Sequence, residues 1–236
     1  MQDALCVLEG QALFSGQEQS VFTRLAGHEG KIYLDLANEQ WQVVEIGPNG
    51  WCVVSKSPVK FRRAKGTLPI PTPIPGGSMD ALRPFVNLAS EADWHLYVAW
   101  LLAAFRPTGP YPVLCVHGEH GSAKTTLSRV ARRLIDPNGA PLRSEPREIR
   151  DIMIAATNGW IVAYDNLSRL PDWLSDALCR LSTGGGFSTR ELYSDADEVL
   201  FEAQRPVALN GIEELATRAD LLDRAVLVYL PRISDE

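Results

Sequence analysis

The sequence has few cysteines and no arrangement of them that suggests a cross-link or a metal site. The four cysteines lie far apart, without a Cys-x-x-Cys pair or a histidine at ligand spacing: Cys6, Cys52, Cys115 and Cys179. These spacings argue against a disulfide framework and against a zinc site. We therefore expect buried or free thiols in a reducing compartment.

Long apolar runs and a positive net charge are also missing. The longest apolar run, Leu96 to Phe105, is too short to span a bilayer, and the N-terminus has no basic-then-apolar signal pattern. A net charge of −6 argues against a protein that coats nucleic acid with its whole surface, although it allows a local basic patch. We expect a cytoplasmic protein with no membrane contact. Its 236 residues suffice for one α/β domain and a smaller module.

A glycine-rich segment at residues 113–126 joins an apolar run to a helix. Glycines at 118 and 121 allow backbone N–H groups to point into one concavity, and the helix N-terminus adds partial positive charge. Lys124 can then reach the β- and γ-phosphates of a nucleotide, and Thr125 can offer its hydroxyl to Mg²⁺. We predict an ATP-binding loop formed by Gly118, Glu119, His120, Gly121, Ser122, Ala123, Lys124, Thr125 and Thr126.

The loop departs from the Gly-x-x-x-x-Gly-Lys-Thr pattern at one position, where Ala123 replaces the second glycine. The change is expected to matter little if residue 123 has a negative φ, because alanine adds only one methyl group. The alternative is a glycine-rich turn with an incidental lysine. We favour the phosphate loop because the strand, the loop, the Lys-Thr pair and the helix at 125–135 follow in the order that phosphate binding needs.

The second informative stretch is the β-branched run that ends at Asp165 and Asn166. A buried strand that follows a phosphate loop by about 40 residues and ends in an aspartate can present one carboxylate to Mg²⁺ or its water. The next residue, Asn166, is an amide, which can orient a water but cannot accept its proton. Either turnover is slow or a base comes from elsewhere.

The N-terminal 65 residues are typical of a small β-rich module, a meander or a small barrel, with β-favouring runs at 31–36, 41–46 and 51–54. The Gly-Pro-Asn-Gly sequence at 47–50 predicts a turn between the last two runs. The module ends in residues 56–65, where five basic side chains surround one aromatic. That segment is either a nucleic-acid contact or, as we favour without a stacking platform nearby, a solvated loop.

A proline-rich stretch at 66–78 predicts an extended linker and a domain boundary. Beyond it, Ser90 and Asp93 form a capping pattern for a helix that is apolar around most of its circumference, so it must be buried, against the nucleotide-binding core. The helix at 125–135 should instead expose Ser128, Arg129, Arg132 and Arg133 to solvent. The alternative for these arginines is a subunit contact.

The remaining chain alternates helices and strands. We expect helices at 147–157 and 171–181, a hairpin of runs at 189–193 and 199–201, and strands at 206–210 and 225–230. Asn210 ends its strand either to contact a γ-phosphate and the attacking water or only to form the turn before Gly211. Arg224, where a helix meets the last strand, is either exposed at an edge or an ion-pair partner of Asp220 or Asp223.

This order of parts resembles the AAA+ ATPase core over residues 80–232. The hairpin before the Asn-ended strand is similar to that of superfamily 3 helicases and their phage or plasmid primase-associated relatives, and the Gly-Ser-Ala-Lys loop is similar to that of minichromosome-maintenance helicases. The resemblance implies a three-layer α/β P-loop fold. It implies Lys124, Thr125 and Asp165 as Walker residues, Asn210 as sensor 1 and Arg224 as an arginine finger. It also implies a C-terminal helical lid with a second sensor arginine. Three alternatives are open: residues 80–106 form the lid, the second sensor arginine is missing, or the sequence is a fragment.

These features together predict an ATP- and Mg²⁺-dependent AAA+-type ATPase that acts in DNA replication as a homo-oligomeric ring, with a helicase function. The hairpin would face the centre of the ring. Its tip is acidic, so Arg190 at its base is the expected DNA contact. The alternatives are an ATP-dependent switch or scaffold that does not move on DNA, and a small-molecule kinase, for which no acceptor site is evident.

Overall fold

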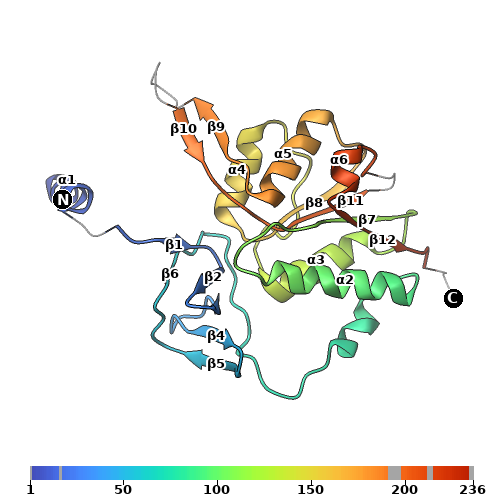
Figure 1. Ribbon diagram of the computed structural model, residues 1–236, viewed down its shortest axis with the longest axis horizontal. Coiled ribbons are helices and arrows are strands. Elements are labelled where there is room, and N and C mark those ends of the chain that lie inside the picture. Colours follow the sequence, from blue (N-terminus) through green and yellow to red (C-terminus); the bar gives the residue numbers. More distant parts are fainter. Residues whose placement is uncertain (1, 16–17, 191–197, 212–214, 234–236) are drawn as a thin grey trace.

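The computed structural model describes residues 2–15, 18–190, 198–211 and 215–233 (Figure 1). The helices are α1 (Gln2–Ser15), the 3-10 helix η1 (Met79–Phe85), α2 (Glu91–Ala104), α3 (Lys124–Ile135), α4 (Ile149–Asn158), α5 (Asp172–Thr183) and α6 (Ala219–Leu222). The strands are β1 (Val21–Phe22), β2 (Leu25–His28), β3 (Lys31–Asp35), β4 (Val43–Gly47), β5 (Gly50–Val54), β6 (Lys60–Phe61), β7 (Val113–Gly118), β8 (Val162–Leu167), β9 (Phe187–Arg190), β10 (Glu198–Phe201), β11 (Val207–Gly211) and β12 (Ala225–Leu230).

A four-stranded parallel sheet with the order β12-β7-β11-β8 forms the centre of the molecule. One face packs against α2 and α3, and the other against α4, α5 and α6, so each face has its own hydrophobic cluster (Figure 1). Strands covered on both faces need continuous apolar runs, as in β7 and β8. The expected mixed α/β fold with buried parallel strands is confirmed.

The N-terminal strands β2 to β5 form an antiparallel meander with neighbours in chain order. Gly47 pairs with Gly50 across the predicted Gly-Pro-Asn-Gly turn. The three predicted β runs correspond to β3, β4 and β5, which confirms the meander. A single parallel bridge joins Arg143 to Tyr164, beside the edge strand β8.

The meander and the parallel sheet share one hydrophobic cluster. Leu25, Leu34 and Leu36 of the N-terminal part lie in the same cluster as Tyr97 and Trp100 of α2. One face of α2 is buried against the core, as expected. The expectation that the whole helix is buried is wrong, because Leu96 and Leu102 on its other face are exposed. The division of the chain at residues 66–78 remains a prediction, and the apolar contact between the two parts crosses it.

A buried ionic junction fastens the meander to the far end of α3. The side chains of Arg24, Arg132 and Asp136 are between 1% and 3% exposed. Arg24 Nε lies 3.3 Å from Asp136 Oδ1, and Arg132 Nη2 lies 3.2 Å from Asp136 Oδ2. Asp136 Oδ2 also accepts hydrogen bonds from the backbone N–H groups of Trp160 and Ile161. The expectation that Arg132 and Ser128 face solvent is wrong, because both are buried.

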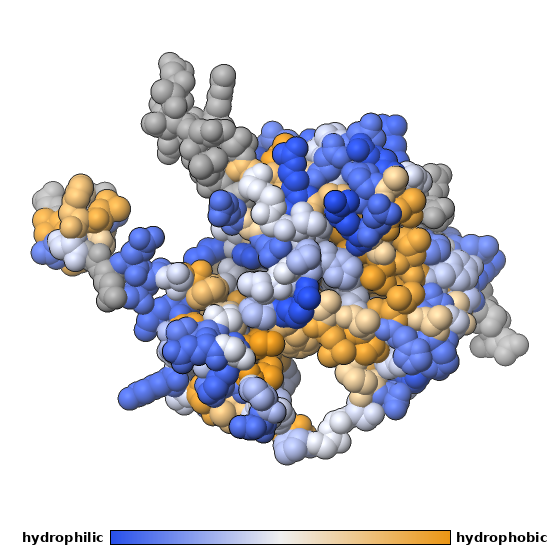
Figure 2. All heavy atoms as spheres, in the orientation of Figure 1, coloured by the Kyte–Doolittle hydropathy of each residue, from blue (hydrophilic) through white to orange (hydrophobic). Residues whose placement is uncertain are grey.

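Helix α1 lies apart from the rest of the protein (Figure 1) and was not predicted from the sequence. Its apolar side chains, including Leu13 at 79% and Phe14 at 90% exposure, face solvent, as Figure 2 shows in orange. Within the ranges that the structure describes, no helix combines the length and apolar character that crossing a membrane requires.

Candidate nucleotide-binding site

The glycine-rich loop follows β7 at the carboxyl edge of the parallel sheet. A Cβ atom on Gly118 would lie 2.3 Å from the backbone oxygen of Leu230 and 2.9 Å from Ser122 Oγ, so only glycine fits there. Gly121 has a φ of +80°, which glycine adopts without steric cost. The two glycines that the sequence singled out are thus required for different reasons, one by a close contact and one by its backbone angle.

The loop leaves a group of backbone donors unpaired. Over the described chain, the backbone N–H groups of residues 120–126 donate to no carbonyl or side-chain acceptor. Ala123, the N-cap of α3, provides no side-chain acceptor for the first turn. Unpaired N–H groups at the start of a helix carry partial positive charge and suit an anion. The loop therefore has the donors that a phosphate group needs.

The backbone of Ala123 does not have the negative φ under which alanine would replace glycine without cost. Its φ is +67°, in the left-handed region, whereas a negative φ was the condition for a harmless replacement of glycine. A left-handed conformation costs a residue with a Cβ atom roughly 1–2 kcal/mol. The methyl group at this position is therefore a local strain rather than a neutral change.

Lys124 begins α3 and turns its ammonium group back over the loop. Lys124 Nζ donates to the backbone oxygens of Gly118 and Glu119, both at 2.7 Å. Burial lowers the pKa of Lys124, and the nearby carboxylate of Asp165 opposes that effect. The cation thus lies on the same loop as the unpaired N–H groups, where it can add a full charge to their partial charges.

Thr125 and Asp165 meet although 40 residues separate them. Thr125 Oγ1 donates to Asp165 Oδ1 at 2.9 Å, from the first turn of α3 to the end of β8. Hydroxyl and carboxylate oxygens are ligands that Mg²⁺ accepts. The described residues contain no cluster of three metal-ligating side chains. A cation here would therefore need oxygens from phosphate and water, which is the usual way in which Mg²⁺ is bound beside a nucleotide.

Asn166 and Asn210 form a linked pair. Asn166 is exposed with a φ of +57°, and its backbone N–H donates to Asn210 Oδ1 at 2.8 Å. Asn210 is 1% exposed, and its Nδ2 donates to Ser128 Oγ at 3.0 Å. Asn210 lies in the register of β11, so it is not merely a turn former. Its amide fixes the backbone after Asp165 against α3, a contact that sequence reasoning missed because it placed Ser128 in solvent.

A further contact that the sequence did not indicate holds the loop from outside. Asn87 Nδ2 donates to the backbone oxygen of Pro231 at 2.7 Å and to that of Ser122 at 3.2 Å. Asn87 thereby joins the segment before α2 to the glycine-rich loop and to the end of β12. Nothing in the local sequence marks such a residue, because its role depends on two segments that are distant in the chain.

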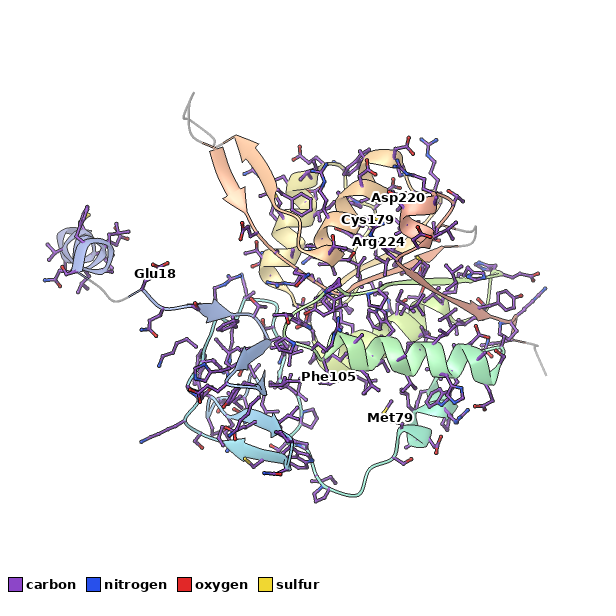
Figure 3. All side chains as sticks on the ribbon, viewed as in Figure 1. Glu18, Met79, Phe105, Cys179, Asp220 and Arg224 are labelled. Atoms are coloured by element: carbon purple, nitrogen blue, oxygen red, sulfur yellow. The ribbon has the colours of Figure 1, made fainter. Side chains whose placement is uncertain are left out.

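Arg224 lies away from the loop. It precedes β12, whose Ala225 pairs with Val113 at the start of β7 while Leu230 pairs with Gly118 at its end. Six residues at about 3.3 Å each separate Arg224 from the loop by about 20 Å. Figure 3 shows Arg224 beside Asp220 and Cys179 on the α5–α6 side. Arg224 donates to the backbone oxygen of Asp220, whereas the Asp220 carboxylate pairs with Arg218.

The predicted hairpin is confirmed by the antiparallel pairing of β9 and β10, in which Arg190 is opposite Glu198. The side chain of Arg190 and the tip at residues 191–197 lie outside the described residues. The DNA contact assigned to Arg190 remains a prediction.

One comparison with known proteins, a match to a family model, supports a role in replication. A solved structure described as "The A form apo structure of NrS-1 C terminal region-CTR" is 14% identical with a TM-score of 0.46, and the match covers 81% of this chain but only 56% of that chain. No curated protein matches. The family model described as "Actinomycete integrative conjugative element replication protein" matches residues 79–234, about two thirds of the sequence. The chain therefore belongs to the family of actinomycete integrative conjugative element replication proteins.

Proposed function

We propose that this replication protein binds and hydrolyses ATP with Mg²⁺ at the carboxyl edge of its parallel sheet, as an AAA+-type motor with a three-layer P-loop core. The observation that carries the proposal is the 2.9 Å hydrogen bond between Thr125 Oγ1 and Asp165 Oδ1. It joins two motifs that lie 40 residues apart in the sequence. The unpaired N–H groups of residues 120–126 and the ammonium group of Lys124 support phosphate binding beside it.

Each residue has a defined task in this proposal. The loop N–H groups and Lys124 bind the phosphates, and they neutralise the charge that develops when the terminal phosphate is transferred. Thr125 and Asp165 would hold Mg²⁺, which would supply positive charge beside the phosphates. Asn210 acts as a positioning residue, because its amide holds the Asn166 backbone. Asn166 faces solvent at the same edge and can orient a water.

The lack of a carboxylate after Asp165 bears on the rate of the reaction. General-base catalysis contributes about 10²–10⁴-fold when a carboxylate or histidine accepts the proton. The Asn166 amide cannot accept a proton. We therefore expect slow hydrolysis unless another subunit or DNA completes the site. This feature also favours a second candidate function, an ATP-dependent switch or scaffold that assembles on DNA without moving along it.

We infer a ring from the position of Arg224. At about 20 Å from the loop of its own subunit, its guanidinium group can neutralise transition-state charge only on a neighbouring subunit's nucleotide. Such a contact is head-to-tail, and it closes into a ring when the rotation between subunits permits. In this arrangement the β9–β10 hairpin projects from the body of the subunit (Figure 1), and we assign its base, at Arg190, to DNA.

The main test is the rate of ATP hydrolysis with and without single-stranded DNA. A motor should hydrolyse ATP faster when DNA is added, whereas a switch should bind ATP and DNA without such stimulation. Asp165→Ala should abolish hydrolysis through loss of the metal ligand. Arg129→Ala is the matched control, since Arg129 is exposed on the same helix as Lys124 and away from the loop. Equal hydrolysis by the Asp165→Ala and Arg129→Ala variants would contradict the proposed site.

The ring is tested by mixing two inactive variants. Arg224→Ala removes the residue that acts on the neighbour, and Lys124→Ala removes the nucleotide site. A mixed ring contains some interfaces in which an intact Lys124 meets an intact Arg224, so activity should partly return. Co-assembly without any recovery of activity would count against a role of Arg224 in trans.

A further inference from the structure

The N-terminal part of the protein contains a cavity that the nucleotide-binding site does not use. It has a volume of about 480 Å³, and its walls include Trp41, Lys56, Lys60 and Phe61. The size falls within the range of sites that hold a small ligand or a nucleotide, about 300–1,000 Å³. Sequence reasoning favoured a solvated loop for residues 56–65 because no stacking platform was evident. The fold brings Trp41 to this loop from a segment that precedes β4.

Trp41 is exposed but fixed in position. Its side chain is 56% exposed, and the guanidinium carbon of Arg63 lies 3.6 Å from the centre of its ring. Arg63 is held in turn by two hydrogen bonds to the carboxylate of Asp35, at 2.6 and 2.9 Å, and Asp35 is buried. One face of the indole therefore rests on a partly buried ion pair. This stacking limits the rotation of the ring, and Trp41 forms part of the cavity wall.

The backbone of Trp41 also suggests a function. Its φ is +55°, which is unusual for a bulky residue and costs roughly 1–3 kcal/mol. Strained residues of this kind cluster at binding sites, where the strain places a side chain for a ligand. Here the strained backbone holds an aromatic ring partly in solvent, where burial of apolar area cannot offset the cost.

The charge around the ring favours an anion. Lys56 and Lys60 are exposed, and over the described residues neither has a carboxylate within 4.0 Å. The acidic group in the cavity wall, Asp35, is neutralised by Arg63. A flat aromatic face beside two unpaired ammonium groups matches a ligand that combines a flat ring with negative charge.

We propose that this cavity binds single-stranded nucleic acid, with a base stacked on Trp41 and neighbouring phosphates on Lys56 and Lys60. A base can stack on a side chain only when it is unpaired, which selects a single strand over a duplex. An acidic peptide would satisfy the lysines, but its carboxylates gain nothing from the aromatic face. The site is separate from the nucleotide-binding edge, and this proposal does not depend on ATP hydrolysis.

The test measures binding of a fluorescently labelled 20-nucleotide oligothymidylate to the full chain, without ATP, by anisotropy. Trp41→Ala should weaken binding roughly 5- to 150-fold, the range for loss of one stacked base, and Trp41→Phe should restore most of it. Trp51→Ala is the matched control, because Trp51 is 43% exposed in the same meander and does not line this cavity. Its affinity should equal that of the parent.

The role of the two lysines is tested separately, by the salt dependence of binding. The logarithm of the binding constant falls as the logarithm of the salt concentration rises, and each neutralised phosphate of a single strand contributes about 0.7 to the steepness of that fall. Replacing both Lys56 and Lys60 by Gln should therefore make the slope less steep by about 1.4. Lys65→Gln, at an exposed lysine outside the cavity wall, serves as the control. Unchanged affinity in Trp41→Ala overturns the proposal. The proposal is also overturned if Trp41→Ala loses as much affinity for a 20-base-pair duplex as for the oligothymidylate. Displacement of the oligothymidylate by polyglutamate at the same charge concentration would overturn it as well.

Discussion

The two ends of helix α3 hold charged groups under opposite conditions. At its start, Thr125 contacts Asp165 and Lys124 contacts the glycine-rich loop, at a sheet edge that is open to solvent and rich in unpaired N–H groups. At its end, Asp136 lies between Arg24 and Arg132, with all three side chains at most 3% exposed. We call the first set the edge site and the second the buried junction.

The comparison separates charges that bind from charges that hold the fold. Groups at the edge site remain accessible, so a ligand can replace their present contacts at little cost to the protein. At the buried junction, each partner compensates another that has already lost its water, and removal of one leaves an uncompensated charge. The same residue types therefore affect mainly activity at one end of the helix and mainly stability at the other.

The largest effect is expected at the buried junction. Asp136→Ala should lower the free energy of unfolding by about 3–5 kcal/mol, because it leaves two buried guanidinium groups without a counter-charge. The backbone N–H groups of Trp160 and Ile161 also lose their acceptor. Urea denaturation measures the change. The control is Asp80→Ala, which removes a pair at the surface and should change stability little. Equal losses in the two variants would remove the distinction between the two ends.

At the edge site, loss of a charged side chain should affect ligand binding more than stability. Lys124→Ala should weaken MgATP binding by more than tenfold, or about 1.4 kcal/mol, because it removes the cation nearest the phosphates. Its unfolding curve should stay close to that of the parent, since Lys124 is only partly buried. Calorimetric titration with MgATP, beside urea denaturation, provides both measurements. Unchanged affinity for MgATP would mean that this loop is not the nucleotide site.

A smaller effect is expected from restoring a carboxylate next to Asp165. Asn166→Glu should keep or raise the rate of hydrolysis, because a carboxylate can accept the proton of the attacking water. Asn166→Asp tests the same idea with less backbone strain. The φ of residue 166 is +57°, in the left-handed region, which aspartate tolerates better than glutamate. We expect a rate equal to the parent's or up to about tenfold higher, below that of an optimised base. A folded variant that binds ATP but hydrolyses it more slowly would show that Asn166 has its own role.

The smallest effect concerns the strain at the start of α3. Ala123→Gly should raise the free energy of unfolding by about 1 kcal/mol, because glycine removes the left-handed strain at a φ of +67°. The midpoint of thermal unfolding should rise by about 2–4 °C. Ala103→Gly, within the regular helix α2, is the opposite control and should destabilise by about 0.5–1 kcal/mol. A fall in stability in both variants would mean that the strain is absent.

Most of the edge site could be predicted from the sequence because its parts are local. Gly118, Gly121, Lys124 and Thr125 lie within eight residues, and the strand that ends at Asp165 has a recognisable apolar run. The buried junction could not be predicted, since Arg24 and Asp136 are 112 residues apart. An arginine in an amphipathic helix gives no local sign that it will be covered, and Arg132 was placed in solvent for that reason.

The sequence by itself determined most of the elements of the meander and of the parallel sheet, and their order, but not helix α1. Apolar runs, turn residues and capping residues defined the meander, the parallel strands and the glycine-rich loop, because these depend on neighbours within a few residues. Only the tertiary structure decided the φ of Ala123, the Asn210–Ser128 contact, the distance of Arg224 from its own loop and the position of Trp41 over Arg63. These features require distant segments to pack together, and the hydrophobic cluster shared by the meander and the parallel sheet is what brings them into contact.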